Sequence, residues 1–215
     1  NEQHAKEAIE AIKNYARTCT YVGLNDYTRQ MGHVLFTAAE VYDWCYPVLT
    51  DEDKEEIVAL CQRIGVDMEI GFPPSGQSAV VGHAGEMQLL RDWLSLAIAT
   101  YDEYPDIYNF VGGRFFSEFV PVRNYWFTSE AHHQGSAYGS SSRHECELWS
   151  QWLIYRMSGE TVYIPEMSQV VYQWIYTRRP DGQLLREGDD YNEGIVKYNY
   201  WYTIAGPWLY ASKFY

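Results

Sequence analysis

The chain has 215 residues, of which 47% are hydrophobic and 21% charged, and its formal net charge is −13 at pH 7. This composition predicts a folded protein with a sizeable core and excludes an intrinsically disordered one. The negative charge argues against a general nucleic-acid or anionic-membrane binder, and no apolar run approaches the roughly 18 residues that span a bilayer.

Aromatic residues reach 17%, with 20 Tyr and 8 Trp. Such amphipathic rings suit wet clefts and carbohydrate faces as well as cores. The four cysteines are widely spaced and form no CxxC pair. We expect them to be buried thiols, with a disulfide as the alternative if the protein is exported.

Apolar residues recur at steps of three and four along most of the chain, as amphipathic helices require. Pro47 disturbs the end of the second predicted helix, and Thr50 can cap the third. A Gly/Pro/Ser-rich break follows at residues 71–82, and "TVYIP" is too short a strand pattern to change the class. The predicted helices cover residues 2–19, 26–49, 50–69, 86–103, 105–126, 143–159, 164–178 and 198–215.

About eight helices joined by loops predict an all-α fold. The helices pair at intervals of a few tens of residues, which is typical of stacked helical hairpins in a solenoid or a closed α/α toroid. We expect a single domain over residues 1–215. Because the last residues run into an apolar helix without a cap or a polar tail, the chain is expected to be part of a longer protein.

The segment "VVGHAGEMQLL" places His83 and Glu86 three residues apart near a predicted helix start. If both are helical, the two side chains share a face. A helix N-terminus disfavours imidazolium, so His83 would stay neutral there and could act as a base or a donor. The alternative is that Glu86 merely caps the helix and His83 is an ordinary histidine.

The segment "EAHHQGSAYGSSSRHECELW", residues 130–149, contains three histidines. Their spacing matches neither HExxH nor a CxxC-supported zinc motif, so we predict no metal site in this chain. Tyr138 lies among small residues that would let a ligand approach its phenol closely. The alternative is a loop tyrosine packed on the surface.

Taken together, "VGHAGEMQLL", "HHQGSAYG" and "RRPDGQLLREGDD" resemble the N-terminal toroid of the heparinase II-type polysaccharide lyases. That family pairs a catalytic histidine with a glutamate three residues on and a tyrosine about fifty-five residues after the histidine. In this sequence His83, Glu86 and Tyr138 match that pattern, because Tyr138 follows His83 by 55 residues. The resemblance covers most of the chain, and its specific part is these three segments.

The resemblance implies a lyase that cleaves uronic-acid-containing polysaccharide by β-elimination, most readily a heparin- or heparan-sulfate-like glycosaminoglycan. Tyr138 would act as general base and acid, while His83 and Glu86 would assist C5 proton abstraction and neutralise the carboxylate. A phenol with a pKa near 10 needs cationic neighbours to act as a base at neutral pH. Arg29 and Arg143 are the candidates, and Arg29 aligns with a substrate-facing arginine of the family.

Other polar side chains near Tyr138 are expected to add substrate contacts: Gln134, His132 and His133. Trp126 or Tyr125 would stack on a sugar ring. The family's further catalytic histidine, structural zinc site and β-sheet domains lie downstream of the matched segments, so the toroid here is expected to be incomplete and to hold no cofactor itself. A periplasmic or secreted location is also expected, with a homodimer left open.

Two other functions compete with the lyase. A toroid glycoside hydrolase would need paired carboxylates, which Glu187, Asp189 and Asp190 in "REGDD" could supply. The alternative for this run is a solvated acidic loop. A non-catalytic glycan-binding helical scaffold is the second competitor, and it would bind ligand without turnover.

Overall fold

The computed structural model describes residues 1–22, 27–74, 87–135, 143–177 and 180. Across these ranges the regular structure is helical and includes no β-strand, which confirms the predicted all-α class. The chain divides into two compact units, Asn1–Phe115 and Phe116–Tyr215. The expected single toroid domain stays a prediction, as does the helix at 198–215, which lies outside the described residues.

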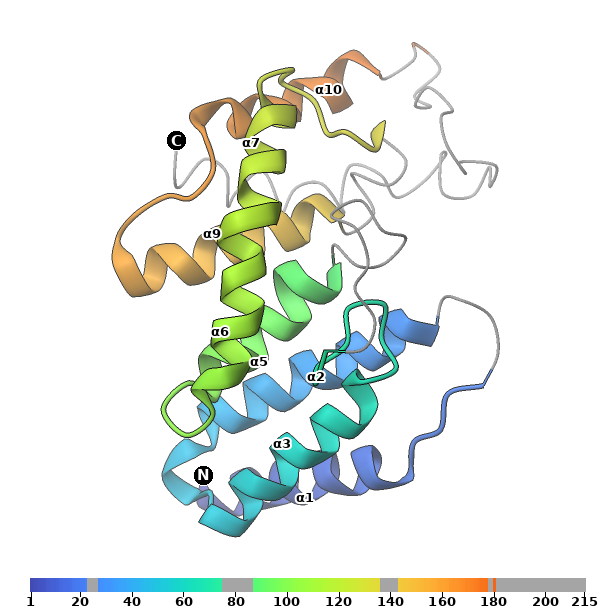
Figure 1. The fold of residues 1–215 in the computed structure, drawn as a ribbon, viewed down its shortest axis with the longest axis vertical. Coiled ribbons are helices and arrows are strands. Elements are labelled where there is room, and N and C mark those ends of the chain that lie inside the picture. Colours follow the sequence, from blue (N-terminus) through green and yellow to red (C-terminus); the bar gives the residue numbers. More distant parts are fainter. Residues whose placement is uncertain (23–26, 75–86, 136–142, 178–179, 181–215) are drawn as a thin grey trace. The chain divides into compact units, whose positions relative to one another are not determined.

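The first unit is organised around α2, which spans Tyr27–Trp44 and contacts α1, Glu2–Thr18, and α3, Asp51–Gly65. Figure 1 shows these three helices side by side. Residues of α2 at helical spacing fill the centre of this unit: Met31, Val34, Leu35, Ala38, Ala39 and Tyr42 are all buried. The apolar periodicity that predicted the helix is therefore the face that α2 buries.

The predicted signals at the junction of α2 and α3 are confirmed. The α-helix ends at Trp44, and a 3-10 turn follows at Tyr46–Val48 around Pro47, which cannot continue an α-helix. Thr50 caps α3: its hydroxyl accepts from the Asp53 backbone N–H, while the Asp53 carboxylate accepts from the Thr50 backbone N–H. This reciprocal pair satisfies two amides that the helix start leaves open.

The helix predicted at 86–103 begins as a π-helix, Gln88–Trp93, and continues as α5, Leu94–Ala99. Side chains of the π-helical turn hold the backbone of Ile70: Gln88 Oε1 accepts from its N–H at 3.0 Å, and Trp93 Nε1 donates to its carbonyl at 2.8 Å. The wide turn also lets Asp92 lie against the backbone of α2 at Gly32, where a Cβ would collide with its carboxyl group. Helix α6, Pro105–Arg114, completes the described part of this unit.

The second unit contains α7, Val120–Phe127, and α9, His144–Ser158. A π-helix, Phe115–Phe119, precedes α7, and Pro121 lies in the first turn of α7, where it lacks the N–H that a regular helix would use. Gly159 ends α9 with a left-handed φ of 75°. The segment predicted as one helix at 164–178 is a 3-10 turn, Pro165–Gln169, followed by α10, Val170–Tyr176.

Side-chain amides support the connection between α9 and the 3-10 turn. Gln151 Oε1 accepts from the backbone N–H groups of Val162 and Tyr163, at 2.9 and 3.2 Å. Asn124 of α7 accepts from the N–H of Ile164 at 3.0 Å and donates to the carbonyl of Val162 at 3.3 Å. The "TVYIP" backbone is thus satisfied by amide side chains instead of by a strand partner.

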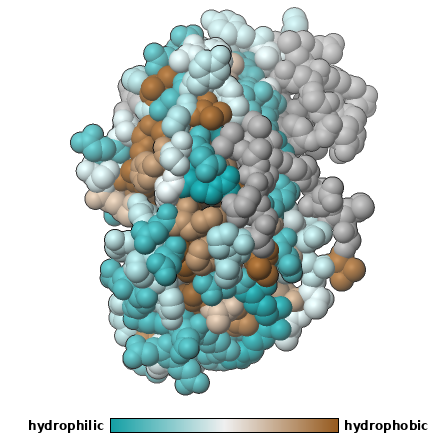
Figure 2. All heavy atoms as spheres, viewed as in Figure 1, coloured by the Kyte–Doolittle hydropathy of each residue, from teal (hydrophilic) through white to brown (hydrophobic). Residues whose placement is uncertain are grey.

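Hydrophobic and hydrophilic side chains are interspersed on the face drawn in Figure 2. Most of the large exposed apolar side chains are tyrosines, which carry a polar hydroxyl: Tyr15, Tyr46, Tyr101, Tyr125, Tyr155, Tyr172 and Tyr176. No disulfide joins the four cysteines, and Cys45, Cys61 and Cys146 are buried while Cys19 is half-buried. Within the described ranges, no helix has both the length and the apolar character needed to cross a bilayer.

Candidate functional site

The three residues predicted to be catalytic, His83, Glu86 and Tyr138, lie outside the described residues. Glu187, Asp189 and Asp190 of the competing hydrolase hypothesis also lie outside them. Arg29 is described and lies half-buried in the first turn of α2, within the first unit. The remaining predicted site residues, His132, His133, Gln134 and Arg143, belong to the second unit.

A buried carboxylate, Glu147, is the centre of a cluster of buried polar side chains in the second unit. It lies in the first turn of α9 and is fully buried. His144, the first residue of the same helix, places its Nδ1 3.0 Å from Glu147 Oε2. Arg123 of α7 places Nε 3.4 Å from the other carboxylate oxygen, Oε1. Two helices, α7 and α9, therefore bring a guanidinium, an imidazole and a carboxylate together in one buried site.

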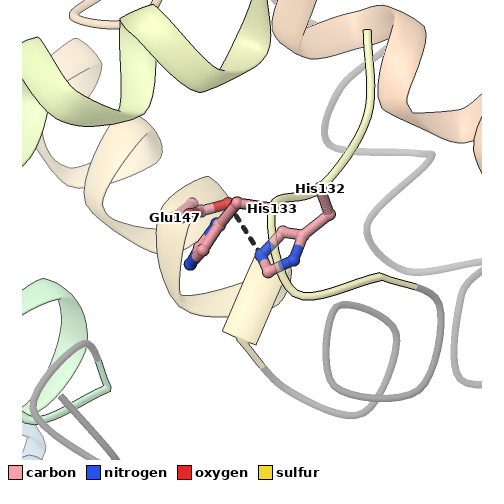
Figure 3. Close-up of side chains that lie close together, drawn as sticks. All are labelled: His132, His133 and Glu147. Atoms are coloured by element: carbon pink, nitrogen blue, oxygen red, sulfur yellow. Dashed lines mark ion pairs between the residues drawn. The ribbon is translucent and has the colours of Figure 1, made fainter. Parts of the chain in front are cut away.

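His132 joins this cluster from the connection between α7 and α9. Figure 3 shows its imidazole directed at the Glu147 carboxylate, with Nε2 3.5 Å from Oε2. The ring also lies edge-on to His144, with centroids 5.8 Å apart. The backbone N–H of His132 donates to Gln173 Oε1 of α10 at 2.6 Å. This one residue thus connects the loop to α9 and α10.

The hydrogen bonds around His132 assign its tautomer. Nδ1 accepts from the Gln134 backbone N–H at 3.2 Å, so Nδ1 holds the lone pair. In the neutral ring the proton then resides on Nε2, the nitrogen that faces Glu147. The carboxylate is consequently surrounded by N–H groups from His132, His144 and Arg123, which favours its ionised form.

Burial and these neighbours shift the pKa of both groups downward. Burial disfavours the imidazolium and holds the pKa of His132 well below its usual 6.5, although the Glu147 carboxylate opposes the shift. Burial by itself would raise the pKa of Glu147, but His132, the hydrogen bond with His144 and the charge of Arg123 outweigh it and lower that pKa. At neutral pH the cluster holds a neutral His132, an ionised Glu147 and a charged Arg123.

His133 is held differently from its neighbour. Its ring stacks on Trp126 of α7, with centroids 3.9 Å apart and planes 20° from parallel. The guanidinium of Arg123 lies 5.2 Å from the Trp126 ring centroid. One indole face is therefore occupied by a side chain of this protein, whereas Tyr125 is 75% exposed. Of the two rings predicted to stack on a sugar, Tyr125 is the more accessible.

His132, His133 and Glu147 have side-chain nitrogens and oxygens within 4.8 Å of one another, which is compatible in residue type with a metal site. The hydrogen bonding fits a metal less well. An Nε2 that carries the proton cannot coordinate an ion, and Arg123 already compensates the charge of Glu147. Among the described residues, Glu147 Oε2 has a hydrogen bond with His144, whereas Glu147 Oε1 and His132 Nε2 have none. The absence of a metal in this chain stays a prediction.

The sequence reasoning missed Glu147, Arg123 and Gln173 as members of this cluster. His144 and Glu147 repeat the three-residue spacing of His83 and Glu86, so the spacing was available as a signal. Arg123 and Gln173 carry no such signal, because they come from helices that only the fold brings beside the loop.

The described part of the first unit has an apolar groove of about 640 Å³ between α1 and α2, lined by Ala8, Ala11, Ile12, Tyr15, Gln30, His33, Val34, Thr37 and Val41. It presents no lysine or arginine, and burial lowers the pKa of His33. An anionic sugar chain would therefore find no positive charge in this groove.

No protein-family model matches the sequence, and the search of curated proteins also gave no match.

Proposed function

We propose that this chain is the helical toroid portion of a polysaccharide lyase similar to heparinase II. Its substrate would be a uronic-acid-containing polysaccharide, with heparin- or heparan-sulfate-like glycosaminoglycans as the first class to test. The observation that carries the proposal is the spacing of His83, Glu86 and Tyr138 within "VGHAGEMQLL" and "HHQGSAYG". The all-α class of the described residues is compatible with a toroid of helical hairpins.

The reaction assigns each of these residues a proton or a charge. Tyr138, as phenolate, removes the C5 proton of the uronic acid, and the C4–O glycosidic bond then breaks as the C4=C5 double bond forms. The phenol returns its proton to the departing oxygen. Negative charge grows on the adjacent carboxylate in the transition state, so a protonated Glu86 and a hydrogen bond from His83 would lower the barrier.

The described residues support this chemistry in two ways. The tyrosine-rich exposed surface offers amphipathic rings of the type that contacts sugars. Arg143, five residues after Tyr138, is a buried cation and is the proposed source of the charge that lowers the phenol pKa. Arg29, Gln134, His132 and His133 stay proposed substrate contacts. Downstream β-sheet domains with a structural zinc, a periplasmic or secreted location and a homodimer belong to the same proposal.

The test is a panel of uronate polysaccharides incubated with the full-length protein, followed by ultraviolet absorbance of the unsaturated product. Tyr138→Phe should abolish that absorbance while the far-ultraviolet circular dichroism stays unchanged. Tyr155→Phe, the same change at an exposed position on α9, is the matched control and should retain activity.

Three outcomes would contradict the proposal. Normal turnover by Tyr138→Phe would show that Tyr138 is not the general base and acid. New reducing ends without ultraviolet absorbance would identify a hydrolase. Binding of polysaccharide without any turnover by the full-length protein would identify a glycan-binding scaffold.

A further inference from the structure

Two tryptophans lie on the side of α9 that faces away from the buried cluster. The interior side of this helix is formed by seven buried residues: His144, Cys146, Glu147, Leu148, Ser150, Gln151 and Ile154. The opposite side is formed by residues that follow one another at steps of three and four: Glu145, Trp149, Trp152 and Arg156. Glu145 and Arg156 are exposed, and the two indoles are half-buried. Large aromatic side chains that reach the outer face of a helix point to an interaction surface.

The side chains on this outer face are stacked in order along the helix. The indole rings of Trp149 and Trp152 have centroids 5.1 Å apart and planes 34° from parallel. The guanidinium of Arg156 lies over the Trp152 ring, 5.6 Å from its centroid. Trp152 therefore has an indole on one side along the helix and a cation on the other. We call Trp149, Trp152 and Arg156 the tryptophan–arginine ladder.

The polar groups of the ladder are available to a ligand. Arg156 makes no ion pair with any residue that the structure describes. Within the same ranges the indole N–H of Trp152 makes no hydrogen bond, and it is not shielded from solvent. A guanidinium that already stacks on an indole has less rotamer freedom to lose when it binds. The ladder thus presents partly ordered N–H donors beside an apolar surface.

An acidic sugar fits this combination of groups. Indole carbons can cover the C–H face of a sugar ring, and a guanidinium pairs with a carboxylate or sulfate through two parallel hydrogen bonds. Because the formal net charge of the chain is −13, an anionic ligand needs a local cation, which Arg156 supplies. Glu145, the other charge on this face, lies about 16 Å further along the helix. The groove between α1 and α2 has no lysine or arginine and lacks this complementarity.

We propose that the tryptophan–arginine ladder is a binding subsite for an acidic sugar unit of a polysaccharide. The indoles contact the sugar ring, Arg156 pairs with its carboxylate or sulfate group, and the Trp152 N–H donates to a sugar oxygen. None of the residues proposed to be catalytic belongs to this subsite. The choice of polysaccharide rests on the proposed function, whereas binding at the ladder does not require turnover.

Calorimetric titration with heparin tests the proposal in the full-length protein, in a Tyr138→Phe background so that the polymer is not cleaved. Trp152→Ala and Arg156→Met should each raise the Kd about fivefold or more, since each removes a donor or a charge from an exposed site. Trp44→Ala is the matched control, because Trp44 is 75% exposed and has no cation over its ring among the described residues. Its Kd should stay within about twofold of the background protein.

Arg156→Lys separates the charge of the side chain from its shape. Lysine keeps the positive charge but cannot present two parallel N–H groups or stack as a plane, so its Kd should lie between those of the background protein and Arg156→Met. The slope of log Kd against log salt should fall by about one in Arg156→Met and stay unchanged in Trp152→Ala. Hyaluronan, which carries carboxylates without sulfates, distinguishes the two anionic groups: an equal effect of Arg156→Met on heparin and hyaluronan identifies the carboxylate.

The subsite and the proposed function fail in different ways. Loss of heparin affinity in Trp152→Ala and Arg156→Met, in a protein without lyase activity on any polymer of the panel, would refute the proposed function and leave the subsite in place. Lyase activity together with equal Kd values for the two variants and the Trp44→Ala control would refute the subsite alone. Should Trp152→Ala fail to fold, the two Arg156 variants still decide, because they change an exposed side chain.

Three further results would overturn the proposal. An Arg156→Lys protein that binds heparin as tightly as the background protein would contradict a role for the stacked guanidinium. Tighter binding of single-stranded DNA than of heparin, lost in Trp152→Ala, would identify a nucleic-acid site. A dimer in sedimentation experiments that dissociates in Trp152→Ala would identify the ladder as a contact between copies of this chain.

Discussion

Asp92 in the first unit and Glu147 in the second are both fully buried carboxyl groups, but their pKa values shift in opposite directions. Burial raises the pKa of Asp92 to about 7, and the Arg91 side chain, 2.7 Å from Oδ1, offsets only part of that rise. Oδ2 of Asp92 and Oε1 of Glu147 both have no hydrogen-bond partner within the described ranges. Glu147 is equally buried, yet its neighbours lower its pKa. The charged and polar neighbours of a buried carboxyl group, and not burial alone, decide its charge.

The largest effect is expected when the charge balance of Glu147 is broken. Arg123→Met should lower the free energy of unfolding by about 3–5 kcal/mol, because it leaves a buried carboxylate without its cation. Urea unfolding followed by fluorescence measures the loss. The double variant Arg123→Met/Glu147→Gln should recover part of it, and Arg156→Met, at an exposed site on α9, should stay within about 0.5 kcal/mol of wild type. A loss of unfolding free energy below about 1 kcal/mol for Arg123→Met would show that Glu147 does not depend on Arg123 to stay ionised.

The free energy of unfolding should depend on pH in opposite ways at Asp92 and Glu147, and this is the next largest effect. Folded Asp92 retains its proton up to about pH 7, whereas the unfolded group loses it near pH 4. Its contribution to stability therefore falls as pH rises through this window, by at most about 1.4 kcal/mol per pH unit. Asp92→Asn removes that dependence, so its stability relative to wild type should improve between pH 4 and pH 7 in urea titrations.

Glu147 predicts the reverse dependence. Its folded pKa lies below the unfolded value, so its contribution is present above about pH 4.5 and is lost as pH falls toward the folded pKa. The cost of Glu147→Gln should be largest at pH 6 and above and smaller near pH 3. Parallel pH profiles for Asp92→Asn and Glu147→Gln would contradict the assignment of opposite shifts.

A smaller effect is expected where Asp92 lies against the backbone of α2. Gly32→Ala should lower the free energy of unfolding by about 1–3 kcal/mol, because the added methyl collides with the buried Asp92 carboxyl group. Gly113→Ala, the same change in α6 with nothing near the added methyl, should instead stabilise by about 0.5–1 kcal/mol through helix propensity. A Gly32→Ala protein as stable as Gly113→Ala would show that Asp92 moves aside freely.

The smallest effect is expected for an exposed glutamate of α9, which serves as the reference for the buried Glu147. Glu145→Gln on the exposed side of α9 should change the free energy of unfolding by less than about 0.5 kcal/mol at any pH between 5 and 8. A larger effect would mean that α9 depends on its first-turn charges themselves and not on the buried Glu147 contacts.

Much of the helical organisation was predictable from local signals. The apolar steps along α2, the Thr50 cap and the stop around Pro47 all depend on residues a few positions apart. The π-helical turns at Gln88–Trp93 and Phe115–Phe119 were not predictable in this way. The extra residue in such a turn is stabilised by distant contacts, here the Ile70 backbone against Gln88 and Trp93.

The candidate site was likewise predictable only in its local part. His132 and His133 could be proposed from the sequence because they are adjacent histidines beside a Gly/Ser-rich segment. Their roles depend on residues from other helices: Arg123 sets the charge of Glu147, and Gln173 and Trp126 hold the loop. Gln173 is 41 positions from His132 and Arg123 is 24 positions from Glu147. Such pairs become partners only through the fold, so periodicity and spacing could not assign them.

The burial of Glu147 has a consequence for protein engineering. Arg123 and Glu147 are both fully buried and come from different helices, α7 and α9. A library that varied one of these two positions alone would leave a buried charge without its counterion. The two positions should therefore be randomised as a pair.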